Sequence, residues 1–139
     1  MPWWRLHYHL IWTTREREPL IDAQRERIIQ ATLQVKAREL GLVLHAVGGI
    51  EDHVHAVVSI PPAIAVAVCV KHFKGASARR VNQAFGADAR FAWQAEYGAV
   101  TLGERSLPRA IEYVQRQRQH HSDKTLIAWY ETVAAPRPT

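Results

Sequence analysis

Two histidines separated by a single residue, His53 and His55, carry the clearest chemistry in the sequence. Residues two apart on a β-strand project from the same face of a sheet, so both imidazoles would point to one side. Two imidazoles at this spacing can share one divalent metal ion. Two surface histidines without a ligand have the same pattern, so the motif by itself leaves both interpretations open.

Tyr113 and Gln117 form a second motif, because residues four apart are neighbours on a helix. They border an apolar stripe formed by Leu107, Ile111 and Val114, which predicts that Tyr113 lies at the edge of the packing surface, within reach of a sheet. Gln117 would offer a carbonyl oxygen as a third metal ligand. An amphipathic helix with a boundary tyrosine is the simpler interpretation of this helix alone.

Taken together, the two motifs suggest phosphoryl-transfer chemistry. A tyrosine hydroxyl has an ordinary pKa of about 10 and is a poor nucleophile at neutral pH unless a base or a metal assists the reaction. A divalent ion held by His53 and His55 would polarise a phosphate oxygen while Tyr113 attacks the phosphorus. The product would be a covalent phosphotyrosine, which conserves the phosphodiester energy for rejoining and requires no ATP.

The periodicity of apolar residues predicts the elements that must position these groups. The predicted strands cover residues 3–14, 42–49, 53–60 and 91–101, and the predicted helices cover 22–40, 64–81 and 106–121. Segment 64–81 also alternates like a strand, but its alanines, its length and the preceding prolines favour a helix. The order is that of an α+β, ferredoxin-like β-α-β-β-α-β fold with an antiparallel sheet, followed by a C-terminal helix that carries the tyrosine.

Helix-capping residues support two of these helices. Asp22 is suited to cap the first helix, and Gly41 follows its predicted end. Ser106 is suited to cap the tyrosine helix, with Pro108 in its first turn. Residues 125–133 are predicted as a short helix, and residues 134–139 as a frayed tail.

Length and composition limit the class of protein. The 139 residues predict a single domain over 1–139, and 47% hydrophobic with 22% charged residues argue against disorder. The single cysteine excludes an intrachain disulfide and a four-cysteine zinc site. The sequence contains no apolar run of about 18–20 residues and no signal-peptide pattern, so we expect a cytoplasmic protein without a membrane partner.

The charge balance suits a polyanionic partner, since 18 basic residues face 13 acidic ones. Candidate contacts to a DNA backbone are a cluster on the second predicted helix and two residues that point outward from the tyrosine helix: Lys71, Lys74, Arg79 and Arg80, with Arg109 and Arg116. A solvated helix face explains the cluster almost as well.

Five segments, in order, resemble the HUH single-tyrosine transposases of small bacterial insertion sequences, whose relatives include the REP-associated tyrosine transposases. The resemblance covers nearly the whole chain, and several motifs in the right order are more specific than any one. The matching segments are HYHLIWTTR at 7–15, DHVH at 52–55, FKGASARR at 73–80, FAWQAEYGA at 91–99 and, at 113–121, YVxxQ with a following His-His pair. One departure is Glu51, where the family more often has an apolar residue.

The resemblance implies an enzyme that cuts and rejoins single-stranded DNA with Mg²⁺ or Mn²⁺. Carried over to this sequence, His53, His55 and Gln117 would bind the metal, and Tyr113 would be the nucleophile that retains the 5′ phosphate. It further implies recognition of DNA hairpins at the ends of a mobile element, a homodimer, and no small-molecule substrate. In several members the tyrosine helix of one subunit completes the histidine site of the other.

Two other functions fit much of the same sequence. A hairpin-DNA-binding module that does not cut, such as a domesticated REP-associated relative, would keep the fold and the basic surface. The joint presence of His53, His55, Tyr113 and Gln117 favours the enzyme, because drift would be expected to remove at least one of them. A replication initiator with HUH chemistry is the third possibility, and the short chain makes it less suitable.

Overall fold

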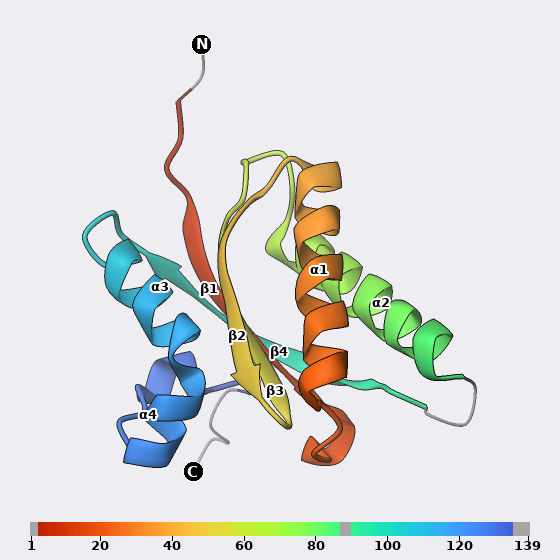
Figure 1. The fold of residues 1–139 in the computed structure, drawn as a ribbon. Coiled ribbons are helices and arrows are strands. Elements are labelled where there is room, and N and C mark those ends of the chain that lie inside the picture. The colour runs from red at the N-terminus through yellow and green to blue at the C-terminus, as the bar shows by residue number, and fades with distance from the viewer. Residues whose placement is uncertain (1–2, 87–89, 135–139) are drawn as a thin grey trace.

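The fold is a four-stranded antiparallel sheet with helices on both faces, seen in a computed structural model that describes residues 3–86 and 90–134 (Figure 1). The strands are β1 His7–Thr14, β2 Val43–Ile50, β3 His53–Ser59 and β4 Trp93–Leu102. The α-helices are α1 Ala23–Leu40, α2 Val66–Phe85, α3 Leu107–Gln115 and α4 Gln117–Asp123, and the 3₁₀ turns are η1 Arg15–Arg17 and η3 Ala128–Tyr130.

The strand order β2-β3-β1-β4, with every neighbouring pair antiparallel, confirms the predicted α+β, ferredoxin-like architecture. The helices α1 and α2 each connect two strands that are not neighbours in the sheet, and one strand lies between the two in each case. As a result β1 and β3 are the central strands. The two histidines of interest therefore lie on a strand that is paired on both sides, where the backbone is held firmly.

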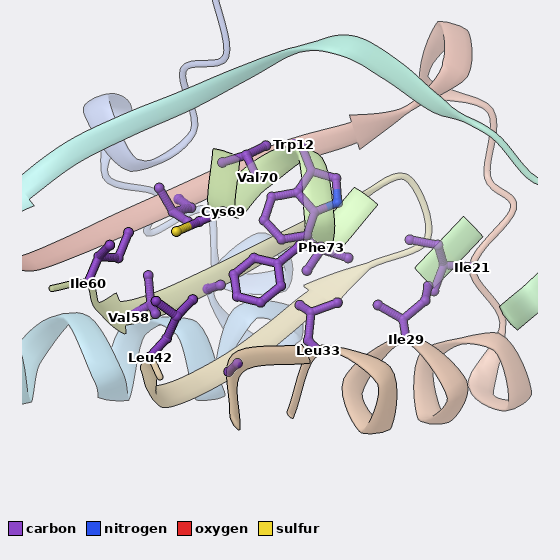
Figure 2. Packing of buried hydrophobic residues seen from close by; sticks show 14 of the residues in the cluster. Trp12, Ile21, Ile29, Leu33, Leu42, Val58, Ile60, Cys69, Val70 and Phe73 are labelled. Atoms are coloured by element: carbon purple, nitrogen blue, oxygen red, sulfur yellow. The ribbon is translucent and has the colours of Figure 1, made fainter. Parts of the chain in front are cut away.

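A hydrophobic core fills the layer between the sheet and the helix pair α1 and α2 (Figure 2). The sheet contributes Val54, Ala56 and Val58, the residues of β3 that alternate with the two histidines and so point to the opposite face. The helices contribute Leu33 and Phe73, both completely buried. Burial of these side chains fixes the pleat of β3, because a slip of one residue would turn every side chain to the opposite face.

The helices α1 and α2 follow the sequence prediction closely. The Asp22 carboxylate accepts a hydrogen bond from the Arg25 backbone N–H at 2.8 Å, and Gly41 ends α1 with a left-handed φ of 74°. The ambiguous segment is helical, as preferred, but α2 begins at Val66 and continues to Phe85. The segment does not form a strand, because its buried residues Val70 and Phe73 have the spacing of a helix and not the alternation of a strand.

Three predicted boundaries near the termini and the hairpin are wrong. The first strand begins at His7 rather than residue 3, and Trp3 is 81% exposed. The second strand runs through Gly48 and Gly49 to Ile50, and the turn is formed by residues 51–52. The predicted helix over 125–133 is only the turn η3, and residues 135–139 of the predicted tail lie outside the described residues.

The predicted tyrosine helix over 106–121 is two helices. Arg116 leaves the helical region, with φ −111° and ψ 31°, so α3 ends at Gln115 and α4 begins at Gln117. Ser106 precedes α3, but its side chain makes no capping hydrogen bond, contrary to the prediction. The break redirects the chain, so that residues after Arg116 reach the sheet at a different angle from those before it.

Among the residues that the structure describes, no helix has the length and apolar character needed to cross a membrane.

Candidate active site

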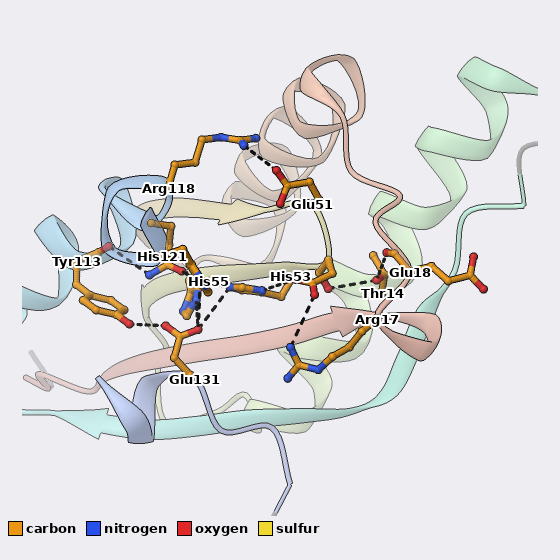
Figure 3. Close-up of polar contacts among 12 residues, drawn as sticks. Thr14, Arg17, Glu18, Glu51, His53, His55, Tyr113, Arg118, His121 and Glu131 are labelled. Carbon is orange, nitrogen blue, oxygen red and sulfur yellow. Dashed lines mark hydrogen bonds and ion pairs between the residues drawn. The ribbon is translucent and has the colours of Figure 1, made fainter. Parts of the chain in front are cut away.

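The imidazoles of His53 and His55 project from β3 onto the sheet face that α3 and α4 cover (Figure 3). Only 2% of His53 and none of His55 is exposed. The shared face confirms the prediction from their spacing, while the helical cover changes their setting. Two imidazoles held in such a dry space are rigid, and they need polar partners there.

Tyr113 lies over these histidines because α3 packs tightly on β2. A Cβ on Gly48 would come within 2.0 Å of the Val114 carbonyl oxygen, so only glycine permits this approach. The Tyr113 ring stands 6.0 Å from that of His55, measured between centroids. Tyr113 was predicted to lie at the edge of the packing surface of its helix. It is only 2% exposed, so it lies within that surface and the prediction was wrong on this point. The buried stripe of α3 is accordingly Ala110, Tyr113 and Val114.

The helix α4 brings two further polar side chains to the histidines. The Gln117 carbonyl oxygen, Oε1, lies 3.3 Å from His53 Nε2. His121 Nε2 lies 3.2 Å from His53 Nε2 and 3.1 Å from Gln117 Oε1. His121 was noted only as part of the family resemblance, and its position depends on the helix break at Arg116.

Glu131 is the site residue that the sequence prediction missed. Its Oε1 lies 3.4 Å from His55 Nε2 and 3.5 Å from His53 Nε2, while its Oε2 accepts a hydrogen bond from the Tyr113 hydroxyl. Two contacts hold the tail at this point. Tyr130 is buried, and the backbone at Thr132 comes so close to Gly98 that a Cβ there would collide with the Thr132 carbonyl oxygen. In the sequence, the only indication of this role was a carboxylate placed directly after Tyr130, a residue of the tail able to pack on the fold.

Five donor atoms thus converge, and their spacing fits a shared metal ion. The closest separations within the set lie between 3.1 and 3.6 Å. Neighbouring ligands at about 2.1 Å from an ion in an octahedron are about 3.0 Å apart, so these separations are close to those of ligands that share one ion. The donor atoms belong to His53, His55, Gln117, His121 and Glu131, and those of His53, His55 and Glu131 all lie within 4.8 Å of one another.

Each of the two strand histidines has a hydrogen-bonding partner behind it. His53 Nδ1 donates to Asp52 Oδ1 at 2.7 Å, an arrangement that leaves Nε2 free to face the donor cluster. His55 Nδ1 lies 2.8 Å from Nε2 of His9, another fully buried imidazole on β1. The nearest acceptor to His55 Nε2 is Glu131 Oε1 at 3.4 Å, a loose contact that falls short of a well-formed hydrogen bond.

Burial sets the charge state of the cluster. It lowers the pKa of His55, of His121 and, to about 3, of His9, so these imidazoles are neutral at pH 7 and keep a lone pair for a metal. Burial also opposes the charged form of Glu131, but the contact of its carboxylate with His55 and the hydrogen bond that it accepts from Tyr113 favour that form, and the pKa is lowered to about 2. For Tyr113, burial and the hydrogen bond to Glu131 raise the pKa to about 12.

The other residues around the cluster have simpler roles. The exposed Glu51 pairs with Arg118 at 3.2 Å and faces away from the donor atoms, which accounts for the departure from the family pattern. His120 stacks on the Tyr113 ring with 4.6 Å between centroids, and its Nδ1 pairs with Thr125 Oγ1. His120 thus supports the position of the tyrosine ring.

The predicted DNA-binding residues fall into three groups. Lys71, Arg79 and Arg80 line a groove between α1 and α2, on the face opposite the donor cluster. Lys74 is turned away: its ammonium donates to the carbonyls of residues 94–96, and burial lowers its pKa. Arg109 and Arg116 are exposed on the tyrosine side, although Arg116 pairs with Glu112 at 3.5 Å.

Comparison with known proteins relates this chain to transposases. Residues 2–117 match the family model described as "Transposase IS200 like". The chain is 29% identical over 122 residues to the ISDra2 transposase TnpA of Deinococcus radiodurans, covering 82% of this chain and 85% of that protein.

Two solved structures share the fold. One, from Deinococcus radiodurans and described as a candidate transposase, superposes with a TM-score of 0.68 at 29% identity, covering 84% of this chain and 93% of that one. The other, a REP-associated tyrosine transposase bound to a REP hairpin, gives 0.64 at 12% identity, covering 87% and 74%. The match of most of the chain to the family, on a fold of the same kind, shows that this protein belongs to the IS200-like transposases, a family of DNA transposases.

Proposed function

We propose that this chain cleaves and rejoins single-stranded DNA through a covalent 5′-phosphotyrosine on Tyr113. The observation that carries the proposal is a bridge: one carboxylate, Glu131, is hydrogen-bonded to the Tyr113 hydroxyl and lies within 3.5 Å of both His53 and His55. A nucleophile and a set of metal-ligand atoms therefore meet in one buried place. Membership of a transposase family supports the same reaction class.

The residues present fit a divalent ion, Mg²⁺ or Mn²⁺. We propose His53, His55 and Gln117 as its ligands, joined by Glu131 and His121, since the imidazole nitrogens, the amide oxygen and the carboxylate each lie within 3.6 Å of at least one other donor. Such an ion would supply Lewis-acid stabilisation of the charge that develops on the phosphate. Asp52 orients His53 from behind, which keeps its Nε2 lone pair directed at the cluster.

The proposed bond changes are an in-line exchange at phosphorus. The Tyr113 oxygen forms a bond to the phosphorus while the bond from phosphorus to the 3′ oxygen breaks. The phenol proton passes to Glu131, its hydrogen-bond acceptor, and the departing 3′ oxygen takes up a proton from solvent water to leave as a hydroxyl. Reversal with a different 3′ hydroxyl gives strand transfer.

In the structure as it stands, Glu131 occupies the space between the tyrosine and the histidines and keeps the phenol protonated. A neutral amide at this position removes the negative charge and replaces the strong carboxylate acceptor by a weaker amide oxygen. In the metal-free protein, Glu131→Gln should therefore lower the Tyr113 pKa from about 12 towards its ordinary value of about 10. Near-ultraviolet titration of tyrosinate, with the signal assigned by subtraction of a Tyr113→Phe protein, measures the change. An unaltered pKa would mean that burial alone sets it.

For the DNA partner, we propose that the α1–α2 groove contacts the phosphate backbone of a hairpin. Lys71, Arg79 and Arg80 line it together with Arg27. These four cations are not paired with a carboxylate among the described residues, and the groove's one acidic side chain, Glu39, pairs with Lys36. When unpaired cations along a groove contact phosphates, the counterions condensed on the DNA are released, and this release favours binding.

The double variant Lys71→Ala with Arg79→Ala should weaken hairpin binding and flatten its salt dependence. Each lost phosphate contact lowers the slope of log affinity against log salt by about 0.7–0.9. Fluorescence anisotropy across a salt series measures the slope, and Arg38→Ala, an exposed cation of α1 outside the groove, is the matched control. Equal slopes for the double variant and wild type would place the DNA elsewhere. Lys74→Met should leave the slope unchanged, because its ammonium is bound to backbone carbonyls.

A non-cutting hairpin-binding module is the alternative function, and covalent trapping separates the two. Wild-type protein is incubated with labelled single-stranded DNA containing randomised hairpins and Mn²⁺, then denatured in SDS. A labelled protein band is expected and identifies a phosphodiester joined to the chain. Hairpin binding without any band would favour the binding module.

We also propose a homodimer acting in the cytoplasm, as the family resemblance implies, and sedimentation of the pure protein tests the dimer. In the single chain, Tyr113 lies over the histidines of its own sheet, the arrangement in which each subunit completes its own site.

A further inference from the structure

We infer that His9 is a positioning residue that selects the metal-binding tautomer of His55, an inference that rests on the metal site proposed above. The two rings come from neighbouring central strands, and His9 Nε2 lies 2.8 Å from His55 Nδ1. Both side chains are almost fully buried, His9 at 1% and His55 at 0% exposure. Water therefore cannot substitute for either partner.

The contact between the two nitrogens holds one proton, and its location decides what His55 offers to a metal. If the proton is on His55 Nδ1, that nitrogen donates to His9 and the lone pair is on Nε2, which faces Glu131 at 3.4 Å. If the proton is on His9, the neutral His55 ring carries its own proton on Nε2 and cannot bind an ion there. His9 thus acts as the acceptor that makes His55 a ligand.

The environment of His9 suits the positioning of His55 and does not suit binding of the metal by His9 itself. Its Nε2 is engaged by His55 Nδ1, and its Nδ1 has no hydrogen-bond partner among the described residues. Its ring packs against Tyr130, 4.4 Å away between centroids, and so is held in one orientation by the same tail that delivers Glu131. His53 has a carboxylate behind it, Asp52, whereas His55 has a neutral ring. The two ligands are therefore supported by different chemistry.

The test compares two replacements of His9 that differ in one property. Leucine fills a similar volume but accepts no hydrogen bond, whereas the glutamine carbonyl can reach the place of Nε2 and accept one. The affinity for Mn²⁺ alone, without DNA, is measured from the free-ion signal in electron paramagnetic resonance. His9→Leu should weaken it about 10–100-fold, and His9→Gln should restore it to within about threefold of wild type. Thermal unfolding in a chelator reports separately on folding.

Each outcome has a distinct meaning. Equal Mn²⁺ affinity for wild type and both variants would overturn the role of His9 and leave the metal site standing. Equal weakening by leucine and glutamine would show that ring packing, not acceptance of a proton, is what matters, and would also overturn it. A wild-type protein that fails to bind Mn²⁺ would overturn the proposed metal site itself.

A second measurement keeps the inference testable if His9→Leu does not fold. Ring ¹⁵N resonances of His55 in wild-type protein loaded with Zn²⁺, a diamagnetic probe, report which nitrogen carries the proton. The expected spectrum has a protonated Nδ1 and a metal-bound Nε2. A metal-bound Nδ1, or a proton on Nε2, would exclude the proposed role.

Discussion

Tyr113→Phe is expected to abolish the covalent protein–DNA product, by at least about a thousandfold, while hairpin binding stays near the wild-type level. The change removes one oxygen atom and keeps the ring, which projects from α3 and packs beside His55 and Tyr130. The lost oxygen makes two hydrogen bonds, to Glu131 and from the Ile127 backbone N–H, so a modest loss of stability of about 1–2 kcal/mol should accompany it. Gel analysis after SDS denaturation measures the product.

The matched control is Tyr97→Phe, on β4, whose ring packs against the core on the opposite face. This variant should trap DNA as wild type does. Trapping by Tyr113→Phe at the wild-type level would remove the proposed nucleophile, whereas loss in both variants would indicate a folding defect and not a chemical one. Thermal unfolding of each protein separates those outcomes.

The paired variant His53→Ala with His55→Ala is expected to remove metal-dependent cleavage and to reduce Mn²⁺ affinity more than about 100-fold. The two imidazoles supply adjacent donors in the cluster, and the remaining Gln117, His121 and Glu131 come from helix and tail segments that the histidines help to hold. Cleavage is followed on a hairpin substrate over a Mn²⁺ series, with a chelator-treated wild-type sample as the reference for loss of metal.

His45→Gln serves as the control, because His45 is a histidine of β2 whose Nε2 bonds to Ser59 Oγ, away from the cluster. Its cleavage and its Mn²⁺ affinity should match wild type. Cleavage by the His53, His55 double variant that still responds to Mn²⁺ would place the metal elsewhere. Binding of hairpin DNA should survive in both proteins, since the proposed DNA groove lies on the other side of the sheet.

The comparison of sequence and structure shows which features are locally encoded. The alternation of Val54, Ala56 and Val58 with the histidines was sufficient to predict both the strand and the face, because side chains on a strand alternate strictly. The helix α1 was equally legible, since Asp22 and Gly41 act within a few residues of themselves. Such signals do not depend on distant parts of the chain.

The position of Tyr113 was predicted less well, for a reason that can be stated physically. Helical periodicity ordered the residues of α3 but did not give the rotation of the helix about its axis, which close packing of Val114 on Gly48 decides. The break at Arg116 was also missed, since nothing in that residue's own preferences ends a helix. Lys74 was read as a DNA contact because its charge is local information, while its bonds to the β4 carbonyls are not.

By itself, the sequence determined the order of elements, the shared face of His53 and His55, and a family resemblance that the comparisons confirm. Only the tertiary structure decided that Glu131 and His121 join them and that His9 lies behind His55. Periodicity and capping act over a few residues, so they can be read along the chain. The donor cluster joins residues up to 78 positions apart, and their meeting depends on how helices and tail pack on the sheet.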